Sequence, residues 1–211
     1  MTLTKNYRCD KVVFEEKFLR PILNQCSRYL QYFSEPEIIG RGTYGKVYKS
    51  MAIHKETKKL LPVAIKVFQI LDQTDFQEVE KTYFMSNTNL GPSLYDSFFF
   101  VDPTPEQYTT QVMIMQGFDM DCSSALQDQS ISIKDKRYIC YQMLELLYFQ
   151  VYQHDFICVD IKPANYVYDK NNKIVRMIDF QQCIIQASTK IRKDFKHIVF
   201  SISLLHLYNL V

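Results

Sequence analysis

The 211-residue sequence contains no tryptophan, few glycines and no long apolar segment. No apolar run is longer than Phe98–Val101, which is far too short to cross a bilayer, so no membrane partner is expected. The formal net charge is +2 without a basic run, which argues against nucleic acid as a partner. No apolar segment follows Met1, and the sequence therefore predicts a cytoplasmic protein.

The six cysteines form no C-x-x-C pair and no group with histidine at the spacing of a zinc site. They are Cys9, Cys26, Cys122, Cys140, Cys158 and Cys183. Scattered cysteines of this kind are typical of proteins in a reducing compartment, which agrees with the cytoplasmic location expected above.

The hydrophobic pattern predicts an α+β fold in a chain of ordinary globular composition. Helical spacing over 11–33 predicts an N-terminal helical extension, which packs on its own domain or awaits a partner helix. A period of two then predicts five antiparallel strands, at 38–39, 47–51, 63–67, 94–101 and 111–115, with a helix at 75–85. Past Gly117 the expected elements are a long helix at 133–153, short strands at 166–168 and 174–178, and a final helix at 192–209. The expected domains are 1–34, 35–116 and 117–211.

The most informative stretch is Asp160-Ile-Lys-Pro-Ala-Asn165, followed after a short hairpin by Ile178-Asp-Phe180. Pro163 prevents a helix from continuing through it, so a loop can direct Asp160, Lys162 and Asn165 toward one site. Phosphoryl transfer to a hydroxyl needs a proton acceptor, a cation and oxygen ligands for magnesium, and Asp179 adds a second such ligand. Taken alone, the hexapeptide also fits a solvated surface turn.

A second motif, Gly40-x-Gly42-x-x-Gly45, lies between two expected strands, and no helix follows it. This excludes the dinucleotide-binding pattern and favours a glycine flap whose backbone amides lie over phosphates. Taken alone, a glycine turn in a hairpin needs no ligand.

Lys66 ends an otherwise apolar strand, Val63-Ala-Ile-Lys66, and therefore needs an anionic partner. Glu80 on the following helix is the preferred partner. Tyr83 and Phe84 follow it at helical spacing and are expected to pack beneath the sheet, so Glu80 would face inward with them. Glu78 is the alternative.

Together these segments resemble a eukaryotic-type Ser/Thr protein kinase. The matching pieces span residues 37 to about 180 in the family's order: the three glycines, Val63–Lys66, a helix glutamate, Val112–Met115, Asp160–Asn165 and Asp179-Phe180. The Lys-Pro pair after Asp160 resembles the Ser/Thr branch. The resemblance implies a bilobal fold, with ATP and Mg²⁺ as cofactors and a protein as substrate.

The resemblance also implies a role for each site residue. Asp160 would be the catalytic base that orients the acceptor hydroxyl, Lys162 would neutralise the γ-phosphate, and Asn165 and Asp179 would hold magnesium. Lys66, held by Glu80, would contact the α- and β-phosphates. The nucleotide site would comprise Gly40, Gly42, Gly45, Val47, Ala64, Lys66, Met115, Gln116 and Phe118, with backbone groups of Gln116 and Phe118 bonding the adenine.

The sequence departs from the family after the catalytic loop. Val159 stands where the family usually has a phosphate-reading arginine, and Gln181 replaces the glycine of Asp-Phe-Gly. Only about fourteen residues separate Asp179 from the final expected helix, and no Ala-Pro-Glu motif follows. The chain thus resembles the minimal kinases of bacterial pathogens and large DNA viruses, which would place it in a host cell's cytoplasm.

Two functions are consistent with this sequence. The first is an active ATP-dependent Ser/Thr protein kinase, and the second is a pseudokinase that serves as a nucleotide-binding interaction module. The reduced C-terminal lobe also predicts that an activating partner or self-association covers the helix at 192–209, unless the N-terminal extension covers it.

Overall fold

The computed structural model describes residues 19, 22–23, 29–41, 45–69, 73–101, 109–153 and 156–185. The described chain divides into two compact units. The first contains the described residues up to Val79 together with Ser93–Gly117. The second contains Glu80–Pro92 and the described residues from Phe118 onward.

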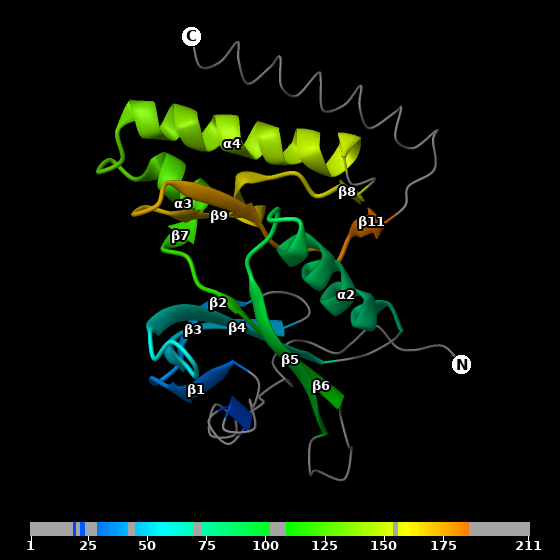
Figure 1. The fold of residues 1–211 in the computed structure, drawn as a ribbon. Helices are drawn as coiled ribbons and strands as arrows, with labels where there is room; N and C mark the ends of the chain where they lie inside the picture. The colour runs from blue at the N-terminus through cyan, green and yellow to red at the C-terminus, as the bar shows by residue number, and fades with distance from the viewer. Residues whose placement is uncertain are drawn as a thin grey trace. The chain divides into compact units, whose positions relative to one another are not determined.

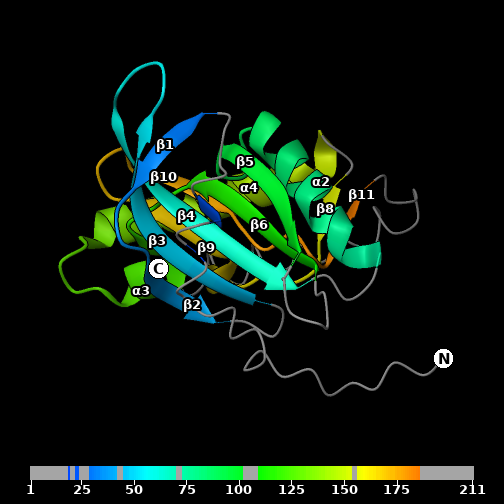
Figure 2. The ribbon, with the colours of Figure 1, turned by 90° about the horizontal axis from the view of Figure 1, so that it is seen from below.

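The first unit is built on an antiparallel sheet, which Figure 2 shows with β3, β4, β6 and β5 side by side. Its strands are β1 (Leu30–Phe33), β2 (Glu37–Arg41), β3 (Gly45–His54), β4 (Leu60–Gln69), β5 (Leu94–Val101) and β6 (Thr109–Gln116). The order is β1-β3-β4-β6-β5, and β2 also pairs with β3. The sheet expected from the sequence is therefore present, with β1 as an additional strand.

The helical prediction is wrong for β1, which pairs antiparallel with β3. Leu30 and Phe33 are buried while Gln31 and Tyr32 are exposed, which imitates helical spacing. The cause is a register irregularity between Gln31 and Phe33, where Tyr32 has a φ of 60°. An extra residue of this kind changes which side of the strand the next side chain occupies.

The two faces of this sheet have different roles. Alternate residues of β3, β4 and β6 join Leu19, Ile22 and Leu23 in one apolar cluster. From these strands it takes Tyr48, Ala52, Val63, Ile65, Val67, Val112 and Ile114. The intervening residues of the same strands face the other way and include Val47, Ala64, Lys66 and Met115, all of them half-buried. Strand alternation therefore places these four candidate nucleotide-binding residues on one face.

Helix α2 (Gln73–Asn87) contributes residues to both units, because Val79 belongs to the first and Glu80 to the second. Its buried side chains include Glu78, Lys81, Thr82 and Met85, at the spacing of one helical face. Tyr83 is 61% exposed, so the expectation that it packs beneath the sheet is wrong.

The second unit contains helices α3 (Cys122–Gln127) and α4 (Ile133–Tyr152) and short strands (Figure 1). The strands are β7 (Met120–Asp121), β8 (Phe156–Cys158), β9 (Tyr166–Asp169), β10 (Ile174–Met177) and β11 (Cys183–Ile185), with a 3₁₀ turn, η1, at Pro163–Asn165. They form two sheets, of order β10-β9-β7 and β11-β8. Ser132 caps α4 by accepting a hydrogen bond from the Asp135 amide at 3.1 Å, which explains why the helix begins at Ile133.

An apolar cluster in this unit takes residues from α4, β8 and the β9–β10 hairpin and includes Ile139, Leu147, Phe156, Tyr166 and Phe180. Among the described residues, no helix has both the length and the hydropathy that a membrane crossing requires. The expected final helix at 192–209, with its partner surface, and most of the expected extension at 11–33 lie outside the described residues.

Candidate active site

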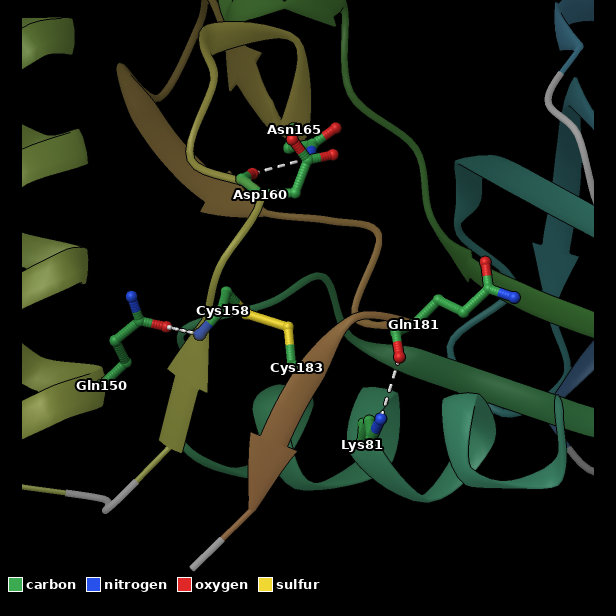
Figure 3. Close-up of a disulfide and its surroundings, with 7 residues drawn as sticks. All are labelled: Lys81, Gln150, Cys158, Asp160, Asn165, Gln181 and Cys183. Carbon is green, nitrogen blue, oxygen red and sulfur yellow. Dashed lines mark hydrogen bonds between the residues drawn. A yellow bond between two sulfur atoms is a disulfide. The ribbon is translucent and has the colours of Figure 1, made fainter. Parts of the chain in front are cut away.

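The catalytic loop expected from the sequence is held by hydrogen bonds around one carboxylate in the second unit. Lys162 Nζ donates to Asp160 Oδ2 at 2.6 Å, and Asn165 Nδ2 donates to the same oxygen at 2.9 Å. Asn165 Nδ2 also donates to the Asp160 carbonyl at 2.9 Å. Pro163 begins the 3₁₀ turn that brings Asn165 back toward Asp160. The structure therefore brings Asp160, Lys162 and Asn165 together, as the sequence predicts. Figure 3 shows the contact between Asp160 and Asn165.

These contacts set the charge of Asp160. The hydrogen bond from Lys162, and after it the one from Asn165, lowers the pKa of the Asp160 carboxyl below its usual value. The carboxylate is accordingly ionised at neutral pH. The same bond raises the pKa of Lys162, with a smaller contribution from the charge of Asp179. A carboxylate held in this way can orient a hydroxyl group and accept its proton as a weak general base.

The β9–β10 hairpin brings the two expected magnesium ligands to the same end of one element. Tyr166 pairs with Met177, so Asn165 and Ile178 flank the open end. The Ile178 amide donates to the Asn165 carbonyl at 2.9 Å, and Asp179 follows directly. Asn165 makes its side-chain bonds through Nδ2, so Oδ1 is the end that can serve as a ligand. An amide oxygen and an exposed carboxylate are hard oxygen donors, which fit Mg²⁺.

Asp179 has a φ of 63°, a left-handed conformation that non-glycine residues rarely adopt. Such a conformation persists where the surrounding structure imposes it, and it is found at functional sites. Gln181 is not among the described residues with a positive φ, so the glycine replaced at this position is not needed for the backbone seen here. Its carbonyl accepts a hydrogen bond of 3.0 Å from Lys81, whose side chain is buried.

In the first unit, Lys66 is paired with Glu78 and not with Glu80. The side chains of Lys66 and Glu78 are 16% and 3% exposed, whereas Glu80 lies on the exposed side of α2. The preference for Glu80 is therefore wrong, because it relied on Tyr83 being buried. The expectation that Lys66 needs a carboxylate on α2 is confirmed.

The glycines among the candidate nucleotide-binding residues of the first unit differ in how closely other atoms approach them. A Cβ on Gly45 would collide with the Val67 carbonyl and lie 2.7 Å from Phe68 Cβ, whereas one on Gly40 would lie 3.7 Å from Val47 Cβ. Val47 is opposite Lys66, and Ala64 is opposite Met115. Thus Gly45 is required by packing within the sheet, and Gly40 is not. Gly42 lies outside the described residues.

The two residues expected to bond adenine through their backbone are assigned to different units. The Gln116 amide already donates to the Ser93 carbonyl at 2.8 Å, so its N–H is engaged within the first unit. Phe118 begins the second stretch of the second unit and is half-buried. The expected backbone hydrogen bonds from Gln116 and Phe118 to adenine stay a prediction, and the Gln116 N–H is not the group that would make them.

A disulfide that the sequence pattern does not predict joins Cys158 and Cys183 (Figure 3). The cysteines are 25 residues apart in sequence and lie opposite each other on β8 and β11. Their scattered positions indicated a reducing compartment, which is at odds with this bond. No spacing rule identifies the pair, because the strands that align the two residues are only three residues long.

Comparisons with known proteins indicate the family of the chain. Residues 33–201 match the family model described as protein kinase domain. The chain is also similar to a curated serine/threonine-protein kinase of Saccharomyces cerevisiae, with 25% identity over 166 residues. That match covers 74% of this chain and 25% of the yeast protein, so the chain corresponds to about a quarter of its relative's length.

Proposed function

Since the chain belongs to the protein kinase domain family, we propose that it is an active kinase that transfers the γ-phosphate of ATP to a serine or threonine hydroxyl of a protein. The observation that carries this proposal is the Asp160 carboxylate bonded to both Lys162 and Asn165. A family member without chemical function would have no need to keep this arrangement. Two observations favour serine and threonine as acceptors. A Lys-Pro pair follows Asp160, and the similar yeast protein is a serine/threonine-protein kinase.

Each residue has a separate task in this proposal. Asp160 accepts a hydrogen bond from the acceptor hydroxyl, directs its oxygen and takes up its proton. Lys162 supplies positive charge where negative charge develops. Lys66, fixed by Glu78, would hold the nucleotide's phosphates, and Asn165 and Asp179 would hold Mg²⁺. When bound, magnesium ATP supplies the transferable phosphoryl group and neutralises part of its charge.

The proposal is tested by replacing the carboxylate at its centre. Asp160→Asn should retain ATP binding and lower turnover by roughly 10² to 10⁴ fold, the range for a lost general base. The measurement is transfer of labelled phosphate to a basic acceptor protein and to the chain itself. Asp135→Asn is the matched control, because Asp135 is also bonded to a lysine, Lys173, at 2.7 Å.

The outcomes separate the two functions consistent with the sequence. Loss of transfer in Asp160→Asn, with full transfer in Asp135→Asn, supports the active kinase. Equal transfer in both variants would show that Asp160 is not the base. A parent protein that binds ATP and transfers no phosphate would instead be a pseudokinase that serves as an interaction module.

The metal ligands can be tested without measuring transfer. Magnesium demands near-octahedral oxygen coordination, so loss of one carboxylate weakens its binding. ATP should therefore raise the thermal stability of the parent more with Mg²⁺ than without it, and Asp179→Ala should remove that difference. If the parent shows no such difference, Asn165 and Asp179 do not hold the metal.

A further inference from the structure

The Cys158–Cys183 disulfide closes a loop that contains the proposed catalytic and metal-binding residues of the second unit, Asp160, Lys162, Asn165 and Asp179. Cys158 precedes Asp160 by two residues, and Cys183 follows Asp179 by four. Lys162 and Asn165 lie between these limits. The bond therefore joins the beginning of the catalytic loop to the segment that follows the second metal ligand (Figure 3).

The backbone pairing that joins these two ends is short. The sheet that contains the cysteines has two strands, β8 and β11, and its register runs only from Cys183–Cys158 to Ile185–Phe156. A pair of strands this short is marginal without further support. In the described part of the chain the disulfide adds a covalent cross-link to this short pairing and to the apolar contact between Phe156 and Phe180.

Each end is also attached to a separate helix. Gln150 Oε1 on α4 accepts a hydrogen bond from the Cys158 amide at 3.3 Å, and Gln150 is fully buried. On the other side, Lys81 on α2 holds the Gln181 carbonyl. With the disulfide broken, the two ends would remain bonded to different helices and would lose their direct covalent connection. The positions of Asp160 and Asp179 would then be less strictly coupled.

The disulfide is buried, whereas the residue that follows each cysteine is exposed. Cys158 and Cys183 are 6% and 5% exposed, but their neighbours Val159 and Ile184 are 51% and 39% exposed. Opening of the three-residue strand pair would therefore bring the sulfur atoms to solvent. Cys122 and Cys140 are free thiols and supply an internal comparison. Burial raises the pKa of the Cys122 thiol to about 12, which makes it unreactive.

We propose that Cys158 and Cys183 form a reversible redox modification site whose disulfide state orders the loop that carries Asp160, Asn165 and Asp179. In reduction, one thiolate of a dithiol attacks a sulfur of the bond and forms a mixed disulfide. Its second thiolate then releases the second cysteine, so the protein gains two electrons and two protons while the dithiol becomes a cyclic disulfide. In oxidation by hydrogen peroxide, one cysteine becomes a sulfenic acid and condenses with the other, and two water molecules are released in total.

The first test measures the bond and the loop, and neither readout depends on kinase activity. The parent is treated with hydrogen peroxide or with dithiothreitol, denatured and alkylated, and its intact mass is measured. Dithiothreitol should expose two more alkylatable thiols than peroxide does. Hydrogen exchange of residues 159–182 should be faster in the reduced form. The midpoint of thermal unfolding should fall by roughly 5 to 10 °C, as expected for opening a loop of this length.

Two variants assign the effect to this pair. Cys158→Ala/Cys183→Ala should behave like the reduced parent under both treatments. Cys140→Ala should keep the difference of two thiols and the slow exchange of the oxidised parent. Should the double variant fail to fold, the reduced and oxidised parent still give the comparison. An equal thiol count after peroxide and dithiothreitol, or equal exchange in the two forms, would overturn the proposal.

The activity measurement rests on the proposed kinase function. Reduction should lower phosphate transfer by about tenfold, because the loop would hold its groups less strictly in position. An inactive parent with a clear difference in hydrogen exchange would overturn the kinase proposal and leave the redox site supported. An active parent whose transfer and exchange are both insensitive to dithiothreitol would overturn the redox site alone.

Discussion

Each of the two units contains one lysine–carboxylate pair among its candidate site residues, and the two pairs have opposite surroundings. In Lys66–Glu78 of the first unit, the side chains are 16% and 3% exposed. In Lys162–Asp160 of the second unit, they are 52% and 37% exposed. The first pair links a strand to a helix, whereas the second lies within one loop. The same kind of ion pair is thus largely buried in the first unit and exposed to solvent in the second.

Because of this difference, substitutions in the two pairs should affect folding and chemistry to different degrees. A buried ion pair is costly to break, because the remaining charge stays out of water without its partner. An exposed pair contributes little to stability, since water screens both charges before and after the change. Substitutions in the first unit should consequently lower stability and activity together, while those in the catalytic loop should change activity and its pH dependence.

The largest effect on stability is expected at Glu78. Glu78→Ala leaves the largely buried Lys66 without this carboxylate and should destabilise the protein by about 3 kcal/mol. Chemical denaturation measures this loss, and phosphate transfer should fall with it. Glu80→Ala, two positions along the same helix, should change stability by no more than about 0.5 kcal/mol, because Glu80 is exposed. Equal losses in the two variants would contradict the pairing.

The Lys66–Glu78 pair shows which parts of the candidate site could be predicted from the sequence. The lysine, the helix and the need for a helix carboxylate were all predicted correctly, because an apolar strand that ends in a lysine limits the options. The choice of residue was wrong because aromatic side chains were taken to mark the buried face, whereas Tyr83 is exposed and Lys81 and Thr82 are buried. Hydrophobicity alone does not identify a helix face that buries charged groups in pairs.

Most strands were predictable because their alternation extends over five or more residues in the sheet of the first unit. β1 was missed because its irregular register gives four residues a helical spacing of buried positions. The disulfide was missed because its partners meet through two short strands that no periodic pattern marks. In the catalytic loop, by contrast, Pro163 and the spacing of polar residues were sufficient to predict the contacts.

A smaller loss is expected from Gly45→Ala, which tests whether the first unit is closely packed. The added Cβ would meet the Val67 carbonyl, and backbone cannot move as easily as a side chain. The expected destabilisation is about 1 to 3 kcal/mol, as for overpacking of a core. In the matched variant Gly40→Ala the nearest atom is at an ordinary contact distance of 3.7 Å, so the loss should be no more than about 1 kcal/mol. If both variants unfold at the same denaturant concentration, Gly45 is not restricted by packing.

The smallest change in stability is expected at Lys162, where the pH dependence should nevertheless change. The Lys162 hydrogen bond is the largest cause of the lowered pKa of Asp160. Lys162→Met should therefore raise the pKa of Asp160 toward its usual value. A carboxyl group whose pKa is lower in the folded than in the unfolded protein stabilises the fold at pH values above its unfolded-state pKa. This stabilisation is lost as the pH falls through the folded-state pKa. Here that contribution is small because the pair is exposed, and the melting temperature at neutral pH should move by about 2 °C or less.

The consequence of Lys162→Met for activity follows from the charge state of Asp160. If the ionised carboxylate orients the hydroxyl, transfer is lost as the pH falls through the pKa of Asp160, and the acidic limb of the rate profile should move to higher pH in this variant. The rate at neutral pH should fall on the order of tenfold, because positive charge near the transferring group is removed. Lys173→Met is the control, since Lys173 bonds Asp135 at 2.7 Å and is similarly exposed. A profile of Lys162→Met that coincides with that of Lys173→Met would show that the Lys162–Asp160 contact does not set the charge state on which transfer depends.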